Sequence, residues 1–391
     1  MPAANYVLAL AAFAVGTQTY VFTGLLSDLA ADLGVSVATA GQLATAFAIT
    51  SAAAAPLVAN ALSGIERRRV LVISLALIGF VNIGAALLPS FEALVAARVL
   101  LAVCSSVIIP LAGAIAACLV EPNRQGRALG LVLSGLTLAF ILGVPLGSVI
   151  GGLFGWRATF VFAGLVSLSV VPAIARWVPR SQAAQRASIG NFGVLARPAV
   201  ALGLVVSVVS FAASYPVFAF IGPLAEAGAG LGSGGIAALQ SMAGFGSILG
   251  IVLGGRMADG RPFAQNTRRL FAGLVVSHAV FSLCFLAPQI GSLWIALPLG
   301  TALFCSSAVL FALGPVVEKV LVQAAPAQSA LTLAMNTSMI YAGQGLGAVL
   351  GGLTIATQGY GALGALGALI AAPALAVALI VGARRCKALP R

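Results

Sequence analysis

Few side chains in this sequence could move protons or bind ions, and most of them are basic. The 391 residues include 20 Lys and Arg, 8 Asp and Glu, and a single histidine, His278. The five cysteines are scattered and form no CxxC pair. No HExxH motif or grouped Ser, His and Asp set is present, so we expect no enzyme activity, no metal site and no cofactor.

Long apolar segments make up most of the chain and carry these residues. The chain is 61% hydrophobic with a mean hydropathy of +1.12. Its charges fall in short gaps between apolar runs of roughly 20 residues, the length that crosses a bilayer. We therefore predict an all-α polytopic membrane protein with twelve transmembrane helices, and the lipid bilayer as its surroundings.

The basic residues indicate orientation rather than nucleic-acid binding. Of the 20, 18 lie in alternate gaps or the tail, at 67–69, 124–127, 176–197, 256–269, 319 and 384–391. Lys and Arg gather in cytoplasmic loops of membrane proteins. We therefore expect both termini in the cytoplasm, and the inner membrane of a bacterium as the location.

The chain also repeats itself at an offset of about 200 residues. Gly143-Val-Pro-Leu-Gly147-Ser-Val-Ile-Gly151-Gly152 matches the segment 343–352, and Phe22-Thr-Gly24 matches 220–222. Such duplication predicts two pseudo-symmetric six-helix bundles, residues 1–178 and 199–391, joined by a cytoplasmic linker at 179–198. Two such halves can alternate access to a site between them.

The 143–152 segment carries the most specific motif. Glycines at 143, 147, 151 and 152 allow helix backbones to approach closely, and Pro145 removes a backbone donor and bends the helix. This pattern suits a helix that rocks against the other half, although a generic small-residue packing face is the alternative. With Gly155-Trp156-Arg157 after it, the segment resembles the antiporter motif of the major facilitator superfamily, in its twelve-helix drug:proton antiporter branch.

The resemblance covers nearly the whole chain and, by its opening segment, points to chloramphenicol-type and sugar or nucleoside exporters. In this superfamily the loops after helices 2 and 8 latch the cytoplasmic side. The first loop keeps Arg67 and Arg68 but has Ser63 in place of the usual Asp, whereas the second keeps Asp259. The resemblance implies a latch between Asp259 and Arg127. Alternatively, the arginines of the first loop only orient the protein in the membrane.

Arg98 lies inside an apolar span, in the position of the superfamily's helix 4 arginine. A charge at membrane depth marks a functional site unless the side chain snorkels to the outer interface, and both interpretations stay open. All eight acids map to loops or helix ends, and Thr19 stands where relatives commonly carry Glu. The lack of an intramembrane carboxylate argues against ordinary proton coupling. His278 would lie on a peripheral helix, where a structural role is expected.

The remaining candidates for a substrate site are neutral. The superfamily arrangement puts helices 1, 4, 7 and 10 around the cavity and 2, 5, 8 and 11 beside it. The polar residues on these helices are Gln18, Thr19, Tyr20, Thr23, Gln42, Thr45, Ser214, Tyr215, Gln240, Asn336, Tyr341 and Gln344. An apolar cavity with hydroxyls and amides suits a small neutral or weakly anionic amphiphile.

We therefore expect a monomeric transporter that exports small-molecule drugs or metabolites. An importer or uniporter of an anion bound at Arg98 is the alternative, and a receptor that transports nothing is a third possibility. No nucleic acid is expected as a partner.

Overall fold

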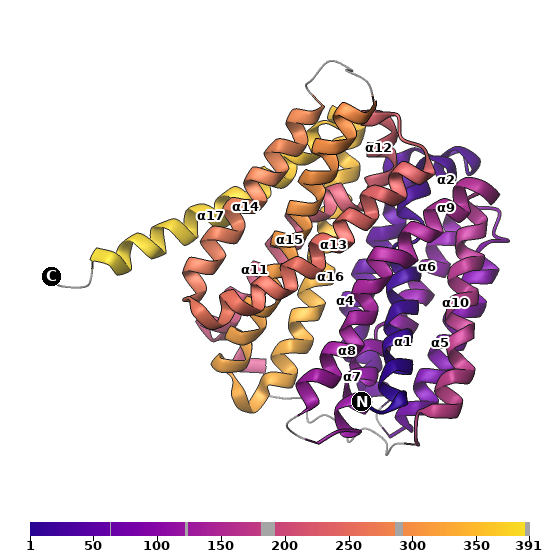
Figure 1. Ribbon diagram of the computed structural model, residues 1–391, viewed down its shortest axis with the longest axis horizontal. Coiled ribbons are helices and arrows are strands. Elements are labelled where there is room, and N and C mark those ends of the chain that lie inside the picture. The colour runs from indigo at the N-terminus through magenta and orange to yellow at the C-terminus, as the bar shows by residue number, and fades with distance from the viewer. Residues whose placement is uncertain (63, 122–123, 181–191, 286–291, 388–391) are drawn as a thin grey trace. The chain divides into compact units, whose positions relative to one another are not determined.

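The structure is a computed structural model that describes residues 1–62, 64–121, 124–180, 192–285 and 292–387 (Figure 1). Within these ranges the regular structure is helical and no strand occurs. The chain divides into two compact units. The first comprises Met1–Ser188 with Gly232–Ser241, and the second Ile189–Leu231 with Met242–Arg391. Most of the predicted linker, 181–191, lies outside the described residues.

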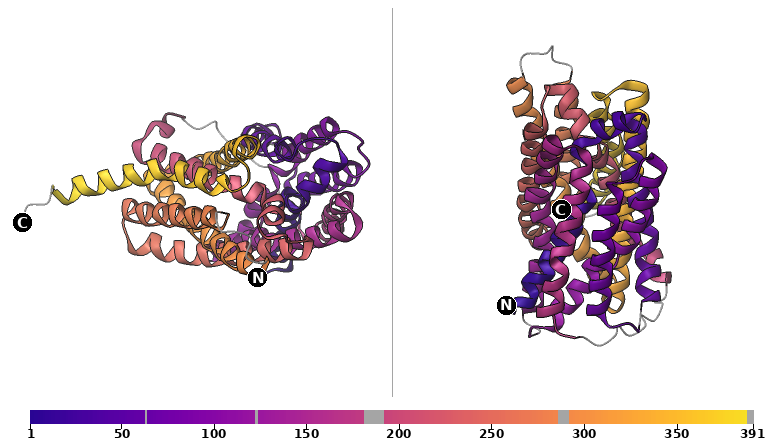
Figure 2. Two further views of the ribbon diagram at one scale, coloured as in Figure 1. Left: turned by 90° about the horizontal axis from the view of Figure 1, so that it is seen from above. Right: turned by 90° about the vertical axis from the view of Figure 1, so that its right-hand side faces the viewer.

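The first unit, indigo to magenta in Figure 2, begins with α1, which packs against α8 and α10. Its helices are α1 (Ala3–Tyr20), η1 (Thr23–Leu25), α2 (Leu26–Asp32), α3 (Val37–Ala40), α4 (Gln42–Ala61), α5 (Arg67–Ala85), α6 (Phe91–Ser105), α7 (Ile108–Cys118), α8 (Gln125–Leu138), the π-helix η3 (Ala139–Gly143), α9 (Val144–Phe154) and α10 (Trp156–Trp177).

The second unit packs its helices around a separate apolar core, which includes Phe271, Leu274, Leu313 and Leu321. Its helices are η4 (Phe192–Ala196), α11 (Pro198–Ala219), α12 (Ile221–Ala229), α13 (Ser233–Gly260), α14 (Phe263–Cys284), α15 (Ser292–Ala324), η5 (Pro326–Gln328), α16 (Ser329–Gln358) and α17 (Ala362–Lys387). The division between the units falls inside α13, after Ser241.

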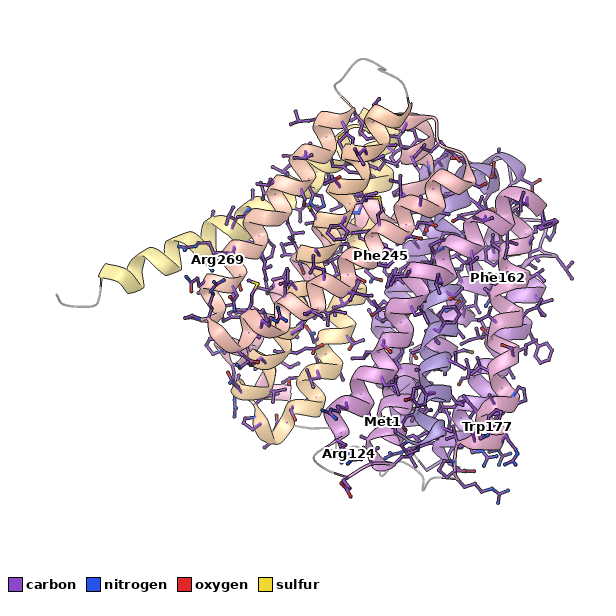
Figure 3. The ribbon with its side chains drawn as sticks, in the orientation of Figure 1. Met1, Arg124, Phe162, Trp177, Phe245 and Arg269 are labelled. Atoms are coloured by element: carbon purple, nitrogen blue, oxygen red, sulfur yellow. The ribbon has the colours of Figure 1, made fainter. Side chains whose placement is uncertain are left out.

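The helices agree with the predicted all-α membrane architecture. Ten helical segments of the described chain are long and apolar enough to cross a bilayer. Two further long helices, α14 and α17, coincide with the other two predicted spans, so the structure is consistent with twelve. In the first unit, Met1, Arg124 and Trp177 lie at one end (Figure 3). The positive-inside pattern assigns these residues to a single face of the membrane.

Three predicted helices contain irregularities that their apolar runs do not reveal. The first helix ends at Tyr20 and resumes at Leu26, after a turn and the short 3-10 helix η1. The fourth is interrupted between Ser105 and Ile108. The fifth widens into the π-helix η3 directly before Pro145, which has no N–H to continue the regular ladder. The distortion expected from this proline is therefore present.

One turn recurs in both units and supports the duplication. Gly155 precedes α10 with φ +86°, and Gly359 precedes α17 with φ +83°, a backbone region open mainly to glycine. Each glycine is followed by an aromatic residue that lies close to an acid. Trp156 Nε1 donates to Asp32 Oδ2 at 3.2 Å. In the second unit, burial and then the Glu226 carboxylate raise the pKa of Tyr360.

The placement of one acid differs from expectation. We expected Glu318, like the other acids, in a loop or at a helix end, but α15 continues past it to Ala324. Glu318 is therefore inside a candidate membrane span, near its end, with an exposed side chain. Lys319 Nζ donates to the Ala258 carbonyl at 3.0 Å and to Asp259 Oδ1 at 2.9 Å, which stabilises this final part of the helix. The prediction that every acid lies in a loop or at a helix end is wrong for Glu318.

In the second unit, α13 packs against α15 through glycines at four-residue spacing. A Cβ atom on Gly246, Gly250 or Gly254 would overlap the carbonyl oxygen of Phe304, Ala308 or Ala312, respectively. Ser307 Oγ donates across the same contact to the Ala243 carbonyl at 2.6 Å. Without a hydrophobic driving force in lipid, such close approach is what holds helices together.

This contact predicts a sharp difference between two glycines of one helix. Gly250→Ala should destabilise the protein by about 1 to 3 kcal/mol, because its methyl group meets the backbone of α15. Gly255→Ala is the matched control, since nothing lies within 4 Å of the added atom, and it should be neutral. Thermal unfolding midpoints in detergent measure both changes. Equal midpoints for the two variants would contradict the proposed packing.

Candidate functional site

Arg98 forms the centre of the polar cluster in the first unit. It lies on α6 with only 1% of its surface exposed, so it does not snorkel to the interface. Nη1 donates to the Gln18 carbonyl at 3.0 Å, and Nη2 donates to the Thr19 carbonyl at 2.7 Å. The guanidinium carbon lies 4.5 Å from the ring centroid of Phe22 and 4.6 Å from that of Phe47. Cation–π contacts and hydrogen bonds thus replace water around this charge.

These bonds fall at the break in the first helix. The carbonyls near the end of α1 lose their helical donors where the chain turns at Val21, and lipid offers none in their place. Arg98 supplies donors to two of them, and Thr23 Oγ1 donates to a third, that of Tyr20, at 2.8 Å. The end of α1 is therefore capped by side chains, and the positive charge at a helix C-terminus is electrostatically favourable.

The side chain of Gln18 extends the cluster from α1 to α6. Its Nε2 donates to Ser105 Oγ at 2.9 Å and to Thr19 Oγ1 at 3.2 Å, and Thr19 Oγ1 donates to the Val15 carbonyl at 2.7 Å. Gln18 is fully buried. Among the described residues its Oε1 has no partner, so it is an available acceptor at membrane depth.

Other candidates in this unit lie on α4 and at the end of α1. Thr45 is buried on α4, two residues before Phe47, with no described partner for its hydroxyl. Gln42 is half-buried and donates at 3.4 Å to the Ala38 carbonyl of the preceding turn. The Tyr20 ring packs on Phe140 of η3, with centroids 5.0 Å apart.

The glycines of the antiporter motif face α1 of their own unit. A Cβ on Gly143, Gly147 or Gly151 would collide with Thr17, Val21 or Leu25, respectively. Glycines at every fourth position of η3 and α9 thus contact residues at every fourth position of α1, the following turn and η1. We expected this face to pack against the other half, but the close approach is made within the first unit. Gly152 differs, because it faces Ser233 at the start of α13.

The candidates in the second unit gather where α11 and α16 pack together. Ser207 Oγ donates to Asn336 Oδ1 at 2.6 Å, and both side chains are buried. Gly347 allows α16 to approach Tyr215 and the Ala212 carbonyl. Ser214 is also buried on α11, Gln344 is buried on α16, and Tyr341 is half-buried beside it. This set is entirely neutral.

Two of the predicted cytoplasmic residues, Arg68 and Asp259, have partners inside their own units. Arg68 donates to the Ala175 carbonyl, which ties the start of α5 to the end of α10. Asp259 forms an ion pair with Lys319, and Arg127 is exposed on α8. Arg67 is half-buried, and Ser63 lies outside the described residues. The Asp259–Arg127 latch would join the two units and remains a prediction.

His278 lies in a packed junction of three helices. It is 1% exposed on α14, and its Nδ1 lies 2.7 Å from the Leu274 carbonyl. A Cβ on Gly367 of α17 would overlap the ring, and the Ala213 carbonyl of α11 lies beside the same position. These contacts agree with the structural role expected for it.

Sequence reasoning missed several partners of these side chains. Ser105 follows Arg98 by seven residues, and Ser207 precedes Ser214 by seven, so helical periodicity places each pair on one face. That signal could have identified both serines. Phe22 and Phe47 had no such signal, because phenylalanine is ordinary in a membrane span.

Comparison with known proteins identifies the family of this chain. A sequence model of the Major Facilitator Superfamily matches residues 8–330. The chloramphenicol resistance protein of Streptomyces lividans is 35% identical over 97% of this chain and 95% of its own length. The inner membrane transport protein YdhP of Escherichia coli (strain K12) is 29% identical over 94% of this chain and 93% of its own.

Solved structures share the fold at low sequence identity. A D-xylose–proton symporter has a TM-score of 0.76 and 15% identity, covering 95% of this chain and 96% of its own. A bacterial homologue of the human lysosomal transporter Spinster, in an inward-facing and occupied conformation, has a TM-score of 0.71 and 17% identity. It covers 96% of this chain and 93% of its own.

The carbonyl contacts of Arg98 predict the effect of a conservative change. Arg98→Lys keeps the charge but loses the fork that reaches two carbonyls, so it should cost about 1 to 3 kcal/mol of stability. Arg157→Lys, at a half-exposed ion pair with Asp32, is the control and should cost less than about 1 kcal/mol. Thermal unfolding in detergent compares them. The assignment of Arg98 as the cap of α1 fails if both variants lose the same stability.

Proposed function

Because this chain belongs to the major facilitator superfamily, we propose that it exports small neutral or weakly anionic amphipathic molecules across a bacterial inner membrane. The export would proceed by alternating access between two six-helix halves, with both termini in the cytoplasm. The homology to a chloramphenicol resistance protein supports efflux and suggests chloramphenicol as the first probe.

The observation that carries the proposal is the chemistry of the buried polar groups. On the cavity helices that the superfamily arrangement implies, the buried polar groups other than the Arg98 guanidinium are hydroxyls and amides: Gln18, Thr19 and Ser105 in the first unit, Ser207 and Asn336 in the second. Hydroxyls and amides bind neutral ligands by hydrogen bonding and offer a permanent cation no opposite charge.

The alternative, an importer or uniporter that binds an anion at Arg98, has less support. Both Nη atoms of Arg98 donate to backbone carbonyls, and its guanidinium lies near two phenyl rings. An anion would have to displace these groups and leave buried carbonyls at the α1 break without donors. That loss costs about 1 to 3 kcal/mol for each carbonyl.

The proposal predicts transport of a neutral probe by the purified protein. Proteoliposomes should move chloramphenicol but not ethidium, a permanent cation of similar size, and an imposed pH gradient should change the rate only weakly. If ethidium is moved and no neutral or weakly anionic probe is, the proposed substrate class is wrong.

Energy coupling gives a separate prediction at Thr19. Threonine does not titrate, whereas a carboxylate at this buried position would exchange protons with the two sides of the membrane. Thr19→Glu should therefore increase the dependence of transport on the pH gradient. Thr19→Gln is the matched neutral control and should leave that dependence as it is. Equal pH responses in the two variants would exclude Thr19 as a position able to couple transport to protons.

A further inference from the structure

The side-chain amide of Gln18 is held in one orientation by its neighbours. Thr19 Oγ1 donates its hydrogen to the Val15 carbonyl at 2.7 Å, and a carbonyl can only accept. Thr19 Oγ1 is thereby left as an acceptor. The Gln18 atom that lies 3.2 Å from it must therefore be the donor Nε2 and not Oε1. The two ends of an amide are nearly identical in shape, so it is this hydrogen-bond network that distinguishes them.

Both hydrogens of the amide nitrogen are used within the first unit. One is donated to Thr19 Oγ1, and the other to Ser105 Oγ on α6 at 2.9 Å. The amide oxygen accepts through two lone pairs, and no donor among the described residues reaches it. Because Gln18 is fully buried, leaving this acceptor unpaired costs free energy. The only group that Gln18 can offer to a ligand is therefore an acceptor.

The charge beside Gln18 restricts which donor it can bind. Arg98 Nη1 donates to the backbone carbonyl of Gln18 at 3.0 Å, so the guanidinium lies close to the same residue. Arg98 is 1% exposed, and like charges repel strongly in surroundings of low dielectric constant. A ligand ammonium could donate to Oε1 only by approaching this buried positive charge. A neutral hydroxyl or amide N–H offers a hydrogen without that repulsion.

A buried amide in the second unit provides a contrast. Asn336 Oδ1 accepts from Ser207 Oγ at 2.6 Å, and both side chains are buried. The amide oxygen of Asn336 thus has a donor from its own unit, whereas that of Gln18 has none among the described residues. Asn336 is therefore a matched comparison for Gln18, because no ligand is needed to pair its oxygen.

We propose that Gln18 Oε1 accepts a hydrogen bond from a neutral donor of the substrate, a hydroxyl or an amide N–H, and so selects which molecules bind. The inference rests on the proposed export function and narrows its substrate class to molecules that carry such a donor on an apolar body. Molecules that offer only acceptors, such as ethers, esters and nitro compounds, leave Oε1 unpaired. A site built to hydrogen-bond one group discriminates strongly against analogues that lack it.

Competition binding tests this preference in the unmodified protein. The purified protein in nanodiscs binds radiolabelled chloramphenicol, which is displaced either by unlabelled chloramphenicol or by its trimethyl derivative, with both hydroxyls and the amide nitrogen methylated. The derivative keeps the ring, the nitro group and the carbonyl but has no hydrogen-bond donor. It should bind roughly threefold to tenfold more weakly, the effect of losing one hydrogen bond. Equal binding of the two compounds, or no binding of chloramphenicol, overturns the inference.

Variants separate the hydrogen bond from the bulk of the added methyl groups. Gln18→Met keeps the length of the side chain but removes the amide oxygen, so the preference for chloramphenicol over the derivative should fall to about twofold or less. Ser105→Ala removes a partner of Nε2 and keeps Oε1, and Asn336→Leu removes an oxygen that is already paired. Both should retain the full preference even where they weaken the binding of both compounds. An undiminished preference in Gln18→Met contradicts the role of Oε1.

Single methylations keep the test decisive if Gln18→Met does not fold. Each of three derivatives of chloramphenicol then lacks one donor, and binding is again measured in the unmodified protein. If one donor pairs with Oε1, one methylation should account for most of the loss of affinity. Three equal losses would indicate bulk alone and would refute the inference.

Transport measurements distinguish a failure of this inference from a failure of the proposed function. If chloramphenicol binds with the expected preference but proteoliposomes do not move it, export is wrong and the assignment of Gln18 stands. If chloramphenicol and the trimethyl derivative are moved at equal rates, export is supported and the requirement for a donor is wrong.

Discussion

The structure of the first unit depends on how the end of α1 is satisfied inside a membrane. A helix that stops within lipid leaves carbonyls that water cannot reach, and each costs several kcal/mol if it stays unpaired. Here the donors come from Arg98 and Thr23, so the break is held by a charge from α6 and a hydroxyl from the next turn. The same hydrogen bonds thus lower both the free-energy cost of burying the arginine and the cost of breaking the helix.

This arrangement also joins α1 firmly to its neighbours. Arg98 and the Gln18–Ser105 bond link α1 to α6, and the glycines of η3 and α9 bring a third helix against the same segment. A conformational change that moved α1 within the unit would break several of these contacts at once. The cheaper movement is one that carries α1, α6 and α9 together, so that these contacts stay intact.

The sequence predicted the helical architecture and singled out Arg98 as either a functional or an interfacial residue, because hydropathy and charge placement are local signals. It did not predict the break after Tyr20, since the run from Val21 to Leu26 is as apolar as the helix before it. Nor did it predict the partners of Arg98. Backbone carbonyls carry no sequence signature, and the two phenylalanines resemble any others in a span. The extension of α15 past Glu318 was not predicted for a related reason. The Lys319–Asp259 pair that stabilises it joins residues 60 positions apart, which no local pattern reveals.

The same distinction explains why the glycine motif was located in sequence but its contacts were not. Glycine spacing says that some backbone comes close, and proline says that some carbonyl is freed, but neither identifies the neighbour. The structure supplies two different neighbours for one segment. Gly143, Gly147 and Gly151 face α1 and its continuation, whereas Gly152 and the Ile141 carbonyl face α13. The first set meets the side chains of Thr17, Val21 and Leu25, whereas in the second set Gly152 meets Ser233 and the Ile141 carbonyl accepts a hydrogen bond from Ser241 Oγ. Two helices therefore share one motif segment, and glycine spacing alone could not tell which glycine faces which helix.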